Sequence, residues 1–383
     1  MSVLISNDVF RQLLGEAQYE IIHYPERTIK AKVKNILKKL LKRSYYVKNP
    51  INWPNGLLAV GVMDLFEAGM ISKEDSEIVS LLATKWMDNG FKIRRVDDSV
   101  AGLAFVKKDI FAAKNLYEYL RTAPTDKDGS LLYNPGHNNN HVLADMIGQA
   151  CPYLVMYGVT QNCPEAISLA ARQITNYIKH GMDTRSGLPY HGYDLSVGYK
   201  IGILGWGRAV GWILMGEAYF LKYVDRAHPA YAEIEAAFIS LVDKTLKFQH
   251  RDGLFCWQIQ GGDGHIDTSA TAMICNAIAM VAKDENDVKT YAPYGVEGDG
   301  RSGADGFGKV GNVGYKYRIL GDECVEAASR GLEGILNNVR DGKIYGGLAE
   351  CIAPGLHPQT YGAYPWVLGP ALSLIARVGE IGK

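Results

Sequence analysis

The sequence predicts an all-α protein, an (α/α)6 toroid of six helical hairpins that form a single domain. Three observations lead to this prediction. Amphipathic segments alternate six times with segments that carry little charge and are rich in Gly and Ala. The second kind has the composition of helices buried on most sides. This alternation is an internal repeat, and the buried segments also begin with similar motifs.

The outer layer is predicted from the amphipathic segments. In the first of them, Ile29, Val33, Ile36 and Leu40 fall on one side of a helix whose other side is rich in lysine. The full outer set is 28–42, 73–89, 110–121, 165–180, 232–248 and 322–338. Residues 1–27 precede the repeat and are predicted to be an N-terminal extension of the single catalytic domain 1–383.

The inner layer is predicted from the segments 53–68, 97–106, 141–157, 206–220, 267–281 and 361–375. They begin with NWPNG, VDDSVAG, HVLADMIG, GWGRAVGW, HIDTSATA and TYGAYPW. Polar and aromatic residues come first in each motif, and small apolar residues follow. Because the inner helices of a toroid run in one direction, we expect the six starts to meet at one mouth that carries the chemistry.

The composition excludes several classes of partner. Lys+Arg and Asp+Glu are both 41 in 383 residues, so nucleic acid and anionic membranes, which attract a basic excess, are not expected. No apolar run approaches the ~20 residues of a membrane span, and MSVLISNDVF shows no signal-peptide pattern. The six cysteines are scattered, which predicts free thiols in a reducing, cytoplasmic compartment and no metal or cofactor.

Aromatic residues are numerous, with 23 tyrosines and 6 tryptophans. The apolar faces of sugar rings stack on such side chains, so the composition suits a carbohydrate cleft and a small oligosaccharide as the partner. For any single aromatic residue, core packing is the competing interpretation.

Several acidic residues lie at the predicted starts of inner helices. Asp145 falls in the first turn of its helix and could act as a general acid/base, or could only complement the helix N-terminus. Asp97 and Asp98 could cap a helix, or one of them could face the cavity and keep a second carboxyl protonated. Asp267, in a good capping sequence, is interpreted as structural.

Two further segments suggest substrate contacts. Arg208 lies between Trp206 and Trp212 in WGRAVGW, where a buried guanidinium needs either a substrate carboxylate or a structural ion pair with a cavity Asp. His191 lies between two tyrosines in the loop PYHGYD. The motifs of a serine nucleophile elbow and of HExxH metalloproteases are absent, and HNNNH (137–141) is interpreted as a polar loop. Residues 283–314 are the longest candidate lid.

On these motifs the chain resembles the unsaturated rhamnogalacturonyl hydrolases, glycoside hydrolase family 105, and more distantly the unsaturated glucuronyl hydrolases. The matching stretches run from Trp53 to Leu374, so they cover most of the chain. They are NWPNG, ADMIGQACPYL, SGLPYHGYD, WGRAVGW, DTSATAM and TYGAYPWVLGPALSL. The resemblance implies the same six-hairpin toroid.

The resemblance also implies a reaction and a set of site residues. Asp145 matches the family's catalytic aspartate, which protonates the C4=C5 double bond of an unsaturated uronate and directs water to C5. The resulting hemiketal collapses and the glycosidic bond breaks. The substrate-site positions that match are Trp53, one of Asp97 and Asp98, His191, Trp206, Arg208 and Trp212. The chain departs from the family's pattern at Leu143, at Ala209–Val210 and in HNNNH, and the second sugar, rhamnose by default, depends on such positions.

Three other functions remain open at this point. An inverting glycosidase would need two cavity carboxylates ~6.5–9.5 Å apart, and Asp145 with Asp98 or Asp267 could supply them. A polysaccharide lyase could use the same toroid. A non-catalytic carbohydrate-binding toroid would use Arg208 as a sugar clamp and Asp145 as a cap, because a fold alone does not determine function.

Overall fold

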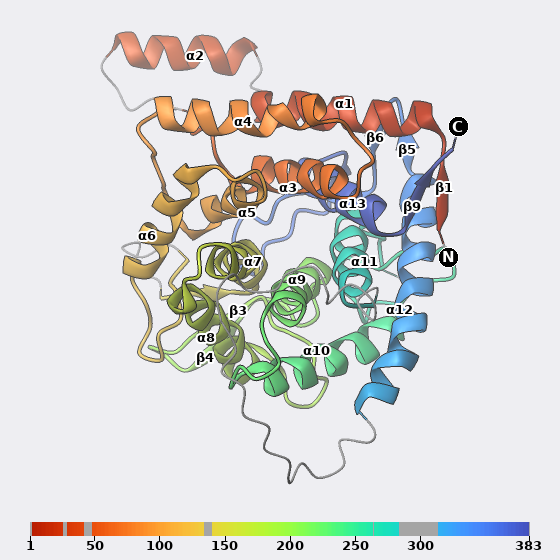
Figure 1. The fold of residues 1–383 in the computed structure, drawn as a ribbon. Helices are drawn as coiled ribbons and strands as arrows, with labels where there is room; N and C mark the ends of the chain where they lie inside the picture. The colour runs from red at the N-terminus through yellow and green to blue at the C-terminus, as the bar shows by residue number, and fades with distance from the viewer. Residues whose placement is uncertain are drawn as a thin grey trace, which may run out of the picture.

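A ring of six helices forms the centre of the structure (Figure 1). The computed structural model describes residues 2–25, 29–41, 48–133, 140–262, 264–282 and 313–382. Each helix of the ring contacts the next, and the last returns to the first. The ring consists of α3 (Trp53–Glu67), α5 (Val100–Lys107), α7 (Ala144–Thr160), α9 (Gly207–Tyr223), α11 (Thr268–Ala282) and α13 (Pro365–Val378).

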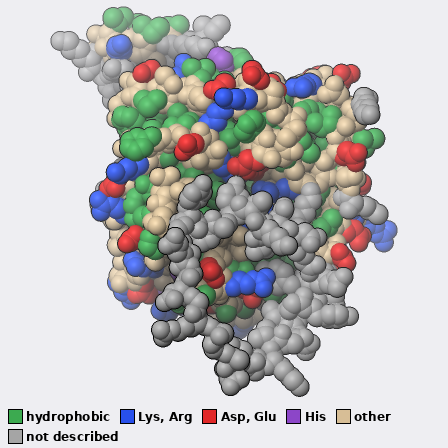
Figure 2. All heavy atoms as spheres, in the orientation of Figure 1, with side chains coloured by type: hydrophobic (Ala, Val, Ile, Leu, Met, Phe, Trp, Pro, Cys, Tyr) green, Lys and Arg blue, Asp and Glu red, His purple; other side chains and the backbone are tan. Residues whose placement is uncertain are grey.

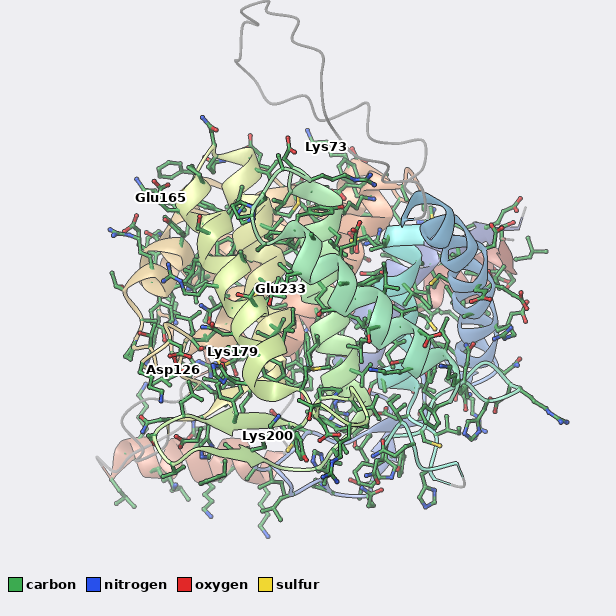
Figure 3. All side chains as sticks on the ribbon, turned by 90° about the horizontal axis from the view of Figure 1, so that it is seen from below. Lys73, Asp126, Glu165, Lys179, Lys200 and Glu233 are labelled. Carbon is green, nitrogen blue, oxygen red and sulfur yellow. The ribbon has the colours of Figure 1, made fainter. Side chains whose placement is uncertain are left out.

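A second layer of helices covers the ring on its outside. It consists of α1 (Asn7–His23), α4 (Lys73–Asp88), α6 (Lys114–Thr122), α8 (Pro164–Gly181), α10 (Tyr231–Leu246) and α12 (Val313–Leu336). Figure 3 labels Lys73, Glu165, Lys179 and Glu233 of this layer, and all of them are exposed. The predicted (α/α)6 toroid in one domain is therefore confirmed.

The remaining elements are short. Two 3-10 helices, η1 (Val96–Ser99) and η2 (Phe111–Ala113), precede α5 and α6. The first strand pairs in parallel with the last, which joins the two ends of the chain. The other pairs are antiparallel and lie in connecting loops. The strands are β1 (Val3–Ile5), β2 (Val142–Leu143), β3 (Gly192–Asp194), β4 (Tyr199–Ile201), β5 (Val339–Arg340), β6 (Lys343–Ile344), β7 (Gly347–Leu348), β8 (Tyr361–Gly362) and β9 (Gly379–Ile381).

Glycine allows the inner helices to approach each other closely. A Cβ atom on Gly61 of α3 would lie 2.5 Å from the carbonyl oxygen of Gly369 in α13. A Cβ atom on Gly148 of α7 would lie 2.4 Å from the Trp212 ring on α9. The Gly- and Ala-rich composition that predicted buried helices is thus a requirement of the tight ring.

The first outer helix differs from the prediction. The segment 28–42 does contain a helix, α2 (Ile29–Leu40), but this helix stands away from the ring (Figure 1). Its apolar residues are exposed, Val33 by 50%, Ile36 by 59% and Leu40 by 73%. Figure 2 shows hydrophobic side chains at the surface of this helix. The outer position belongs to α1, which lies within the predicted N-terminal extension and packs on α3, α4 and α13. The prediction failed because an amphipathic stripe does not show which surface it will cover.

Two predicted features lie largely outside the described residues. The candidate lid 283–314 falls almost entirely on residues 283–312, and HNNNH falls largely on residues 134–139, neither of which the structure describes. Within the described residues, every helix is too short or too polar to cross a lipid bilayer.

Candidate active site

The starts of the inner helices meet at one end of the ring, as predicted. Trp53 at the start of α3 packs edge-on against Trp212 of α9, with ring centroids 6.2 Å apart. The same ring lies 5.0 Å from Trp366 at the start of α13. Arg208 of α9 lies 4.9 Å from the ring of Trp206, and its Nη1 is 3.7 Å from Asp267 Oδ2 before α11. These contacts define the mouth of the toroid.

Asp145 and His191 form a pair at this mouth. Strand β2 leads directly into α7 and pairs with β3, so that the backbone N–H of Ala144 donates to the carbonyl oxygen of His191 at 2.9 Å. This pairing places His191 Nε2 3.2 Å from Asp145 Oδ2. The sequence suggested both residues separately, but the short sheet between them brings them together.

Accessibility distinguishes Asp145 from the other candidate acids. Its side chain is 19% exposed, whereas Asp97 is 1% exposed and both Asp98 and Asp267 are 0% exposed. Each of these three buried carboxylates also lies within 4 Å of an arginine nitrogen. Among the four candidates, Asp145 is therefore the carboxylate that a substrate can reach and that no arginine neutralises.

Asp97 differs from Asp98 in its contacts. Its Oδ2 lies 2.9 Å from Arg95 Nη2 and accepts a hydrogen bond from the Tyr133 hydroxyl at 3.3 Å, while its Oδ1 has no partner. Burial raises the pKa of Asp97 to about 6, although Arg95 opposes this shift. The pKa of Tyr133 is raised by burial, then by Asp97, and also by Asp145, which places both acids near this hydroxyl.

Asp98 and Asp267 have structural roles. Asp98 accepts hydrogen bonds from the backbone and guanidinium of Arg94 and from Asn49, at 2.7–3.3 Å. Asp267 Oδ1 accepts from the backbone N–H groups of Ser269 and Leu348 at 2.9 and 3.0 Å and from the Ser269 hydroxyl at 2.5 Å. These bonds hold Asp98 and Asp267 Oδ1 within the protein, whereas the buried Asp267 Oδ2 has no hydrogen-bond partner and lies 3.7 Å from Arg208 Nη1.

Arg208 is held by the protein on both terminal nitrogens. Nη1 donates to Leu348 O at 2.7 Å and to Ser269 Oγ at 3.2 Å, and Nη2 donates to Ala349 O at 2.8 Å. These contacts, together with the 3.7 Å approach to Asp267, lie within the protein, as the structural interpretation of Arg208 assumes. The guanidinium ties α9 to the segment that follows β7, and this segment reaches the mouth.

The tryptophans of the predicted site differ in their exposure and in their contacts. Trp206 stacks near His191, with centroids 4.4 Å apart, and its buried indole N–H has no partner. Trp53 is half-buried and donates from Nε1 to Glu350 Oε1 at 3.3 Å. Trp212 is 1% exposed and packs on Gly148, so it supports Trp53 from behind.

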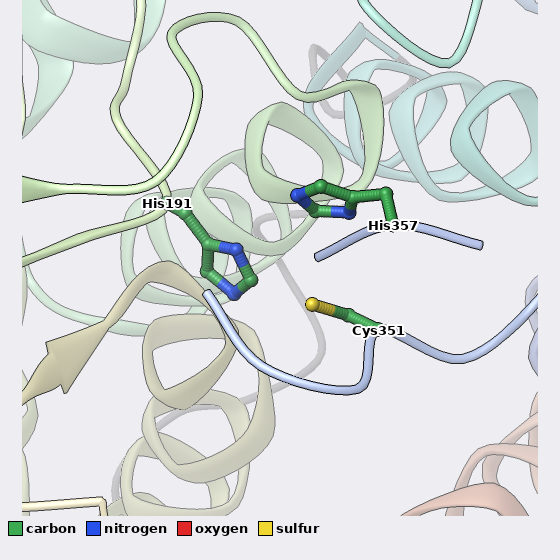
Figure 4. Close-up of side chains that lie close together, drawn as sticks. All are labelled: His191, Cys351 and His357. Atoms are coloured by element: carbon green, nitrogen blue, oxygen red, sulfur yellow. The ribbon is translucent and has the colours of Figure 1, made fainter. Parts of the chain in front are cut away.

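The loop between β7 and β8 contributes residues that the sequence analysis did not single out. His357 lies 4.9 Å from the Trp206 ring and 5.4 Å from the His191 ring. Cys351 lies beside them (Figure 4). Tyr133 and Arg95 were also missed. No local motif marks these residues. Tyr133 contacts Asp97 from 36 positions away, Cys351 and His357 lie in an irregular loop, and Arg95 lies two positions before Asp97 with nothing to indicate the pairing.

Two of the three departures from the family pattern are buried. Leu143 is 4% exposed in β2, and Ala209 and Val210 are 0% exposed in α9. These substitutions therefore change the packing beneath the mouth, and any effect on the choice of sugar must be transmitted through the side chains above them.

Comparison with known proteins gives consistent results. The sequence profile of Glycosyl Hydrolase Family 88 matches residues 28–295, more than half of the chain. The unsaturated rhamnogalacturonyl hydrolase YesR of Bacillus subtilis (strain 168) is 24% identical over 269 residues, covering 66% of this chain and 77% of YesR.

Solved structures share the fold at low sequence identity. A protein of Salmonella enterica serovar Paratyphi A, described as a possible member of glycoside hydrolase family 105, has a TM-score of 0.74 and 14% identity, with 97% of this chain and 94% of the other covered. The unsaturated glucuronyl hydrolase of Bacillus sp. GL1 has a TM-score of 0.65 and 14% identity, with 96% of each chain covered.

Proposed function

Since this chain is a glycoside hydrolase of Glycosyl Hydrolase Family 88, we propose that it hydrolyses unsaturated uronyl oligosaccharides with Asp145 as the general acid/base. One observation carries the proposal: among the four candidate carboxylates at the mouth, Asp145 is the accessible one without an arginine partner. A single carboxylate suits a hydration, in which one group first gives and then takes a proton.

The proposed reaction begins at the double bond of the uronate. The Asp145 carboxyl group gives its proton to C4, and water adds to C5 while the carboxylate takes a proton from that water. The product is a hemiketal at C5. Its ring opens to a ketone at C5 and a hemiacetal at C1, and the hemiacetal then expels the second sugar as an alcohol. One water is consumed, and Asp145 returns to its starting state.

The neighbours of Asp145 support this role. His191 Nε2, 3.2 Å from Oδ2, can orient the carboxyl group, and Oδ2 has no other partner. The half-buried Trp53 can offer an apolar face to a sugar ring, whereas Trp206 is 1% exposed and supports His191. Asp97 is a second buried acid, which accepts a hydrogen bond from Tyr133 and forms an ion pair with Arg95. A conventional inverting glycosidase would need a second accessible carboxylate. The other three sequence candidates are buried and paired, so this role would fall to the exposed Glu350 beside Trp53.

The substrate that we propose is an unsaturated galacturonyl-rhamnose disaccharide released by a lyase from rhamnogalacturonan. The support comes from the motifs WGRAVGW and DTSATAM and from the similarity to YesR, an unsaturated rhamnogalacturonyl hydrolase. An unsaturated glucuronyl disaccharide is the second substrate to test, because the glucuronyl hydrolases share the fold.

Ultraviolet absorbance tests the proposal. The C=C bond of an unsaturated uronate is conjugated with its carboxylate and absorbs ultraviolet light, so hydration must lower the absorbance. We expect a fall with disaccharides from lyase-digested rhamnogalacturonan, and a smaller one with those from glycosaminoglycan. A rise on intact polymer would instead identify a lyase. Unchanged absorbance while the glycosidic bond is cleaved would identify a conventional hydrolase. Absence of any reaction with unsaturated disaccharides would refute the proposal.

A further inference from the structure

Three potential metal ligands from two distant parts of the chain meet at the mouth. One ring nitrogen each of His191 and His357 and the Cys351 Sγ atom lie within 4.8 Å of one another (Figure 4). His191 precedes β3, whereas the other two lie on the loop between β7 and β8. The scattered cysteines of the sequence predicted no such arrangement.

The histidine nitrogens of this cluster have no hydrogen-bond partner. His191 is 2% exposed and its Nδ1 is buried without a hydrogen bond. Both ring nitrogens of His357 are buried in the same way. Leaving such buried atoms unpaired is unfavourable, and a bound ion would relieve that cost. Burial and the neighbouring His191 and Arg208 lower the pKa of His357 to about 4, so this imidazole is neutral, the form that binds metals.

We propose that His191 Nδ1, Cys351 Sγ and a ring nitrogen of His357 form a site for a divalent transition-metal ion of the Zn²⁺ type, and that this ion inhibits the enzyme. Two imidazoles and one thiolate are a ligand set for tetrahedral Zn²⁺, with a fourth position left to water. Metal–ligand distances of about 2.0–2.3 Å place the ligands roughly 3.5 Å apart. The longest ligand separation must therefore shorten by up to about 1.3 Å, within an irregular loop.

Asp145 completes the arrangement from the opposite side of His191. A metal-bound histidine usually gives its second nitrogen to a carboxylate, which fixes the ring. Here His191 Nε2 lies 3.2 Å from Asp145 Oδ2. An ion on Nδ1 would hold the histidine beside the catalytic carboxyl group and lie in the space that the substrate enters. This inhibitory part of the inference rests on the proposed function, whereas the metal site does not.

Binding requires the Cys351 thiol to lose its proton. This thiol now donates to Ala353 O at 2.8 Å, and burial, followed by the charge of Asp145, raises its pKa to about 12. The metal must displace that proton, so its affinity increases with pH. The thiolate formed in this way also provides a spectroscopic signal, because a Co²⁺ ion bound to a thiolate shows a charge-transfer band.

Cobalt titration of the full chain, first stripped with EDTA and desalted, tests the site without any substrate. We expect one Co²⁺ per chain, with a thiolate charge-transfer band that Zn²⁺ abolishes. The Cys351→Ser variant should lose the band, and His357→Ala should weaken binding. Cys163→Ser, a matched control at a half-buried thiol, should keep the band. Asp145→Asn should weaken binding about 10–100-fold, as loss of a carboxylate behind a metal-ligating histidine does.

Each result bears on a separate part of the inference. No band in the wild-type chain, or a band that persists in Cys351→Ser, would overturn the site even if the enzyme hydrolyses unsaturated uronates. Inhibition by Zn²⁺ that EDTA reverses in the wild type and that is absent in Cys351→Ser would support the inhibitory role. Activity that EDTA abolishes and Zn²⁺ restores would overturn that role. A metal spectrum without any turnover of sugars would keep the site and refute the proposed function.

Discussion

Replacement of Arg208 by alanine should destabilise the protein strongly, because its guanidinium holds together three parts of the mouth. The change removes hydrogen bonds to Leu348 O, Ser269 Oγ and Ala349 O at 2.7, 3.2 and 2.8 Å. It also leaves Asp267, 0% exposed, without the cation 3.7 Å away. Removal of one partner from a buried ion pair costs about 3–5 kcal/mol. We expect that loss in the free energy of unfolding of Arg208→Ala.

Urea unfolding followed by circular dichroism measures this loss directly. Arg185→Ala, at an exposed arginine, is the control and should change stability by less than about 0.5 kcal/mol. Arg208→Lys, which keeps the charge but not the planar fork, should recover part of the loss. Because the β7–β8 loop loses its anchor, kcat should fall together with kcat/KM under conditions where the variant is folded. Wild-type stability with a raised KM and unchanged kcat would refute this reasoning and make Arg208 a ligand of the substrate carboxylate.

Three further predictions concern the acids. Asp145→Asn should lower kcat by at least ~10², the low end of a general acid/base contribution, without a loss of folded structure; near-wild-type turnover in the ultraviolet assay would remove Asp145 from the mechanism. The pKa of Asp97 rises from 3.8 to about 6, so its contribution to stability is complete below pH 4 and is lost as the pH rises through 6. Between pH 4 and 7 the free energy of unfolding of the wild type should therefore fall by roughly 3 kcal/mol relative to Asp97→Asn. If the wild type and the variant showed the same pH dependence of stability, the raised pKa of Asp97 would be contradicted. Asp64 lies at the opposite end of the ring and pairs with Lys107 at 2.7 Å and Arg377 at 3.5 Å. Asp64→Asn should thus cost about 3–5 kcal/mol in urea unfolding with an unchanged KM, whereas a stable variant with altered KM would show that this cluster communicates with the mouth.

The arrangement of the helices was largely predictable from local patterns. Apolar spacing and Gly/Ala content repeat within single segments, and each segment must bury its apolar face whatever its neighbours are. The first-turn position of Asp145 and the meeting of the inner-helix starts followed from the same patterns. The exception is α2, whose stripe has the correct period but covers no part of the ring. An amphipathic pattern shows that one face of a helix is apolar, but it does not show which surface that face packs against.

The chemical state of the site depended on contacts between distant residues. Asp97 and Asp98 are neighbours in a sequence that does not distinguish them, but Arg94 and Asn49 engage one and Tyr133 contacts the other. The partners of Arg208 on the β7 segment lie 140 positions along the chain.

The sequence by itself thus determined the toroid and its mouth, because these follow from the periodicity of short segments, whereas Asp145 was singled out among the acids by the resemblance to the family. Only the tertiary structure decided which carboxylate stays accessible and which residues join it. His191 meets Asp145 through the pairing of β2 and β3, and it meets Cys351 and His357 through a loop far along the chain. Burial and charge pairing arise when such distant segments pack together, and they determine whether an acid caps a helix, balances an arginine or remains available to a substrate.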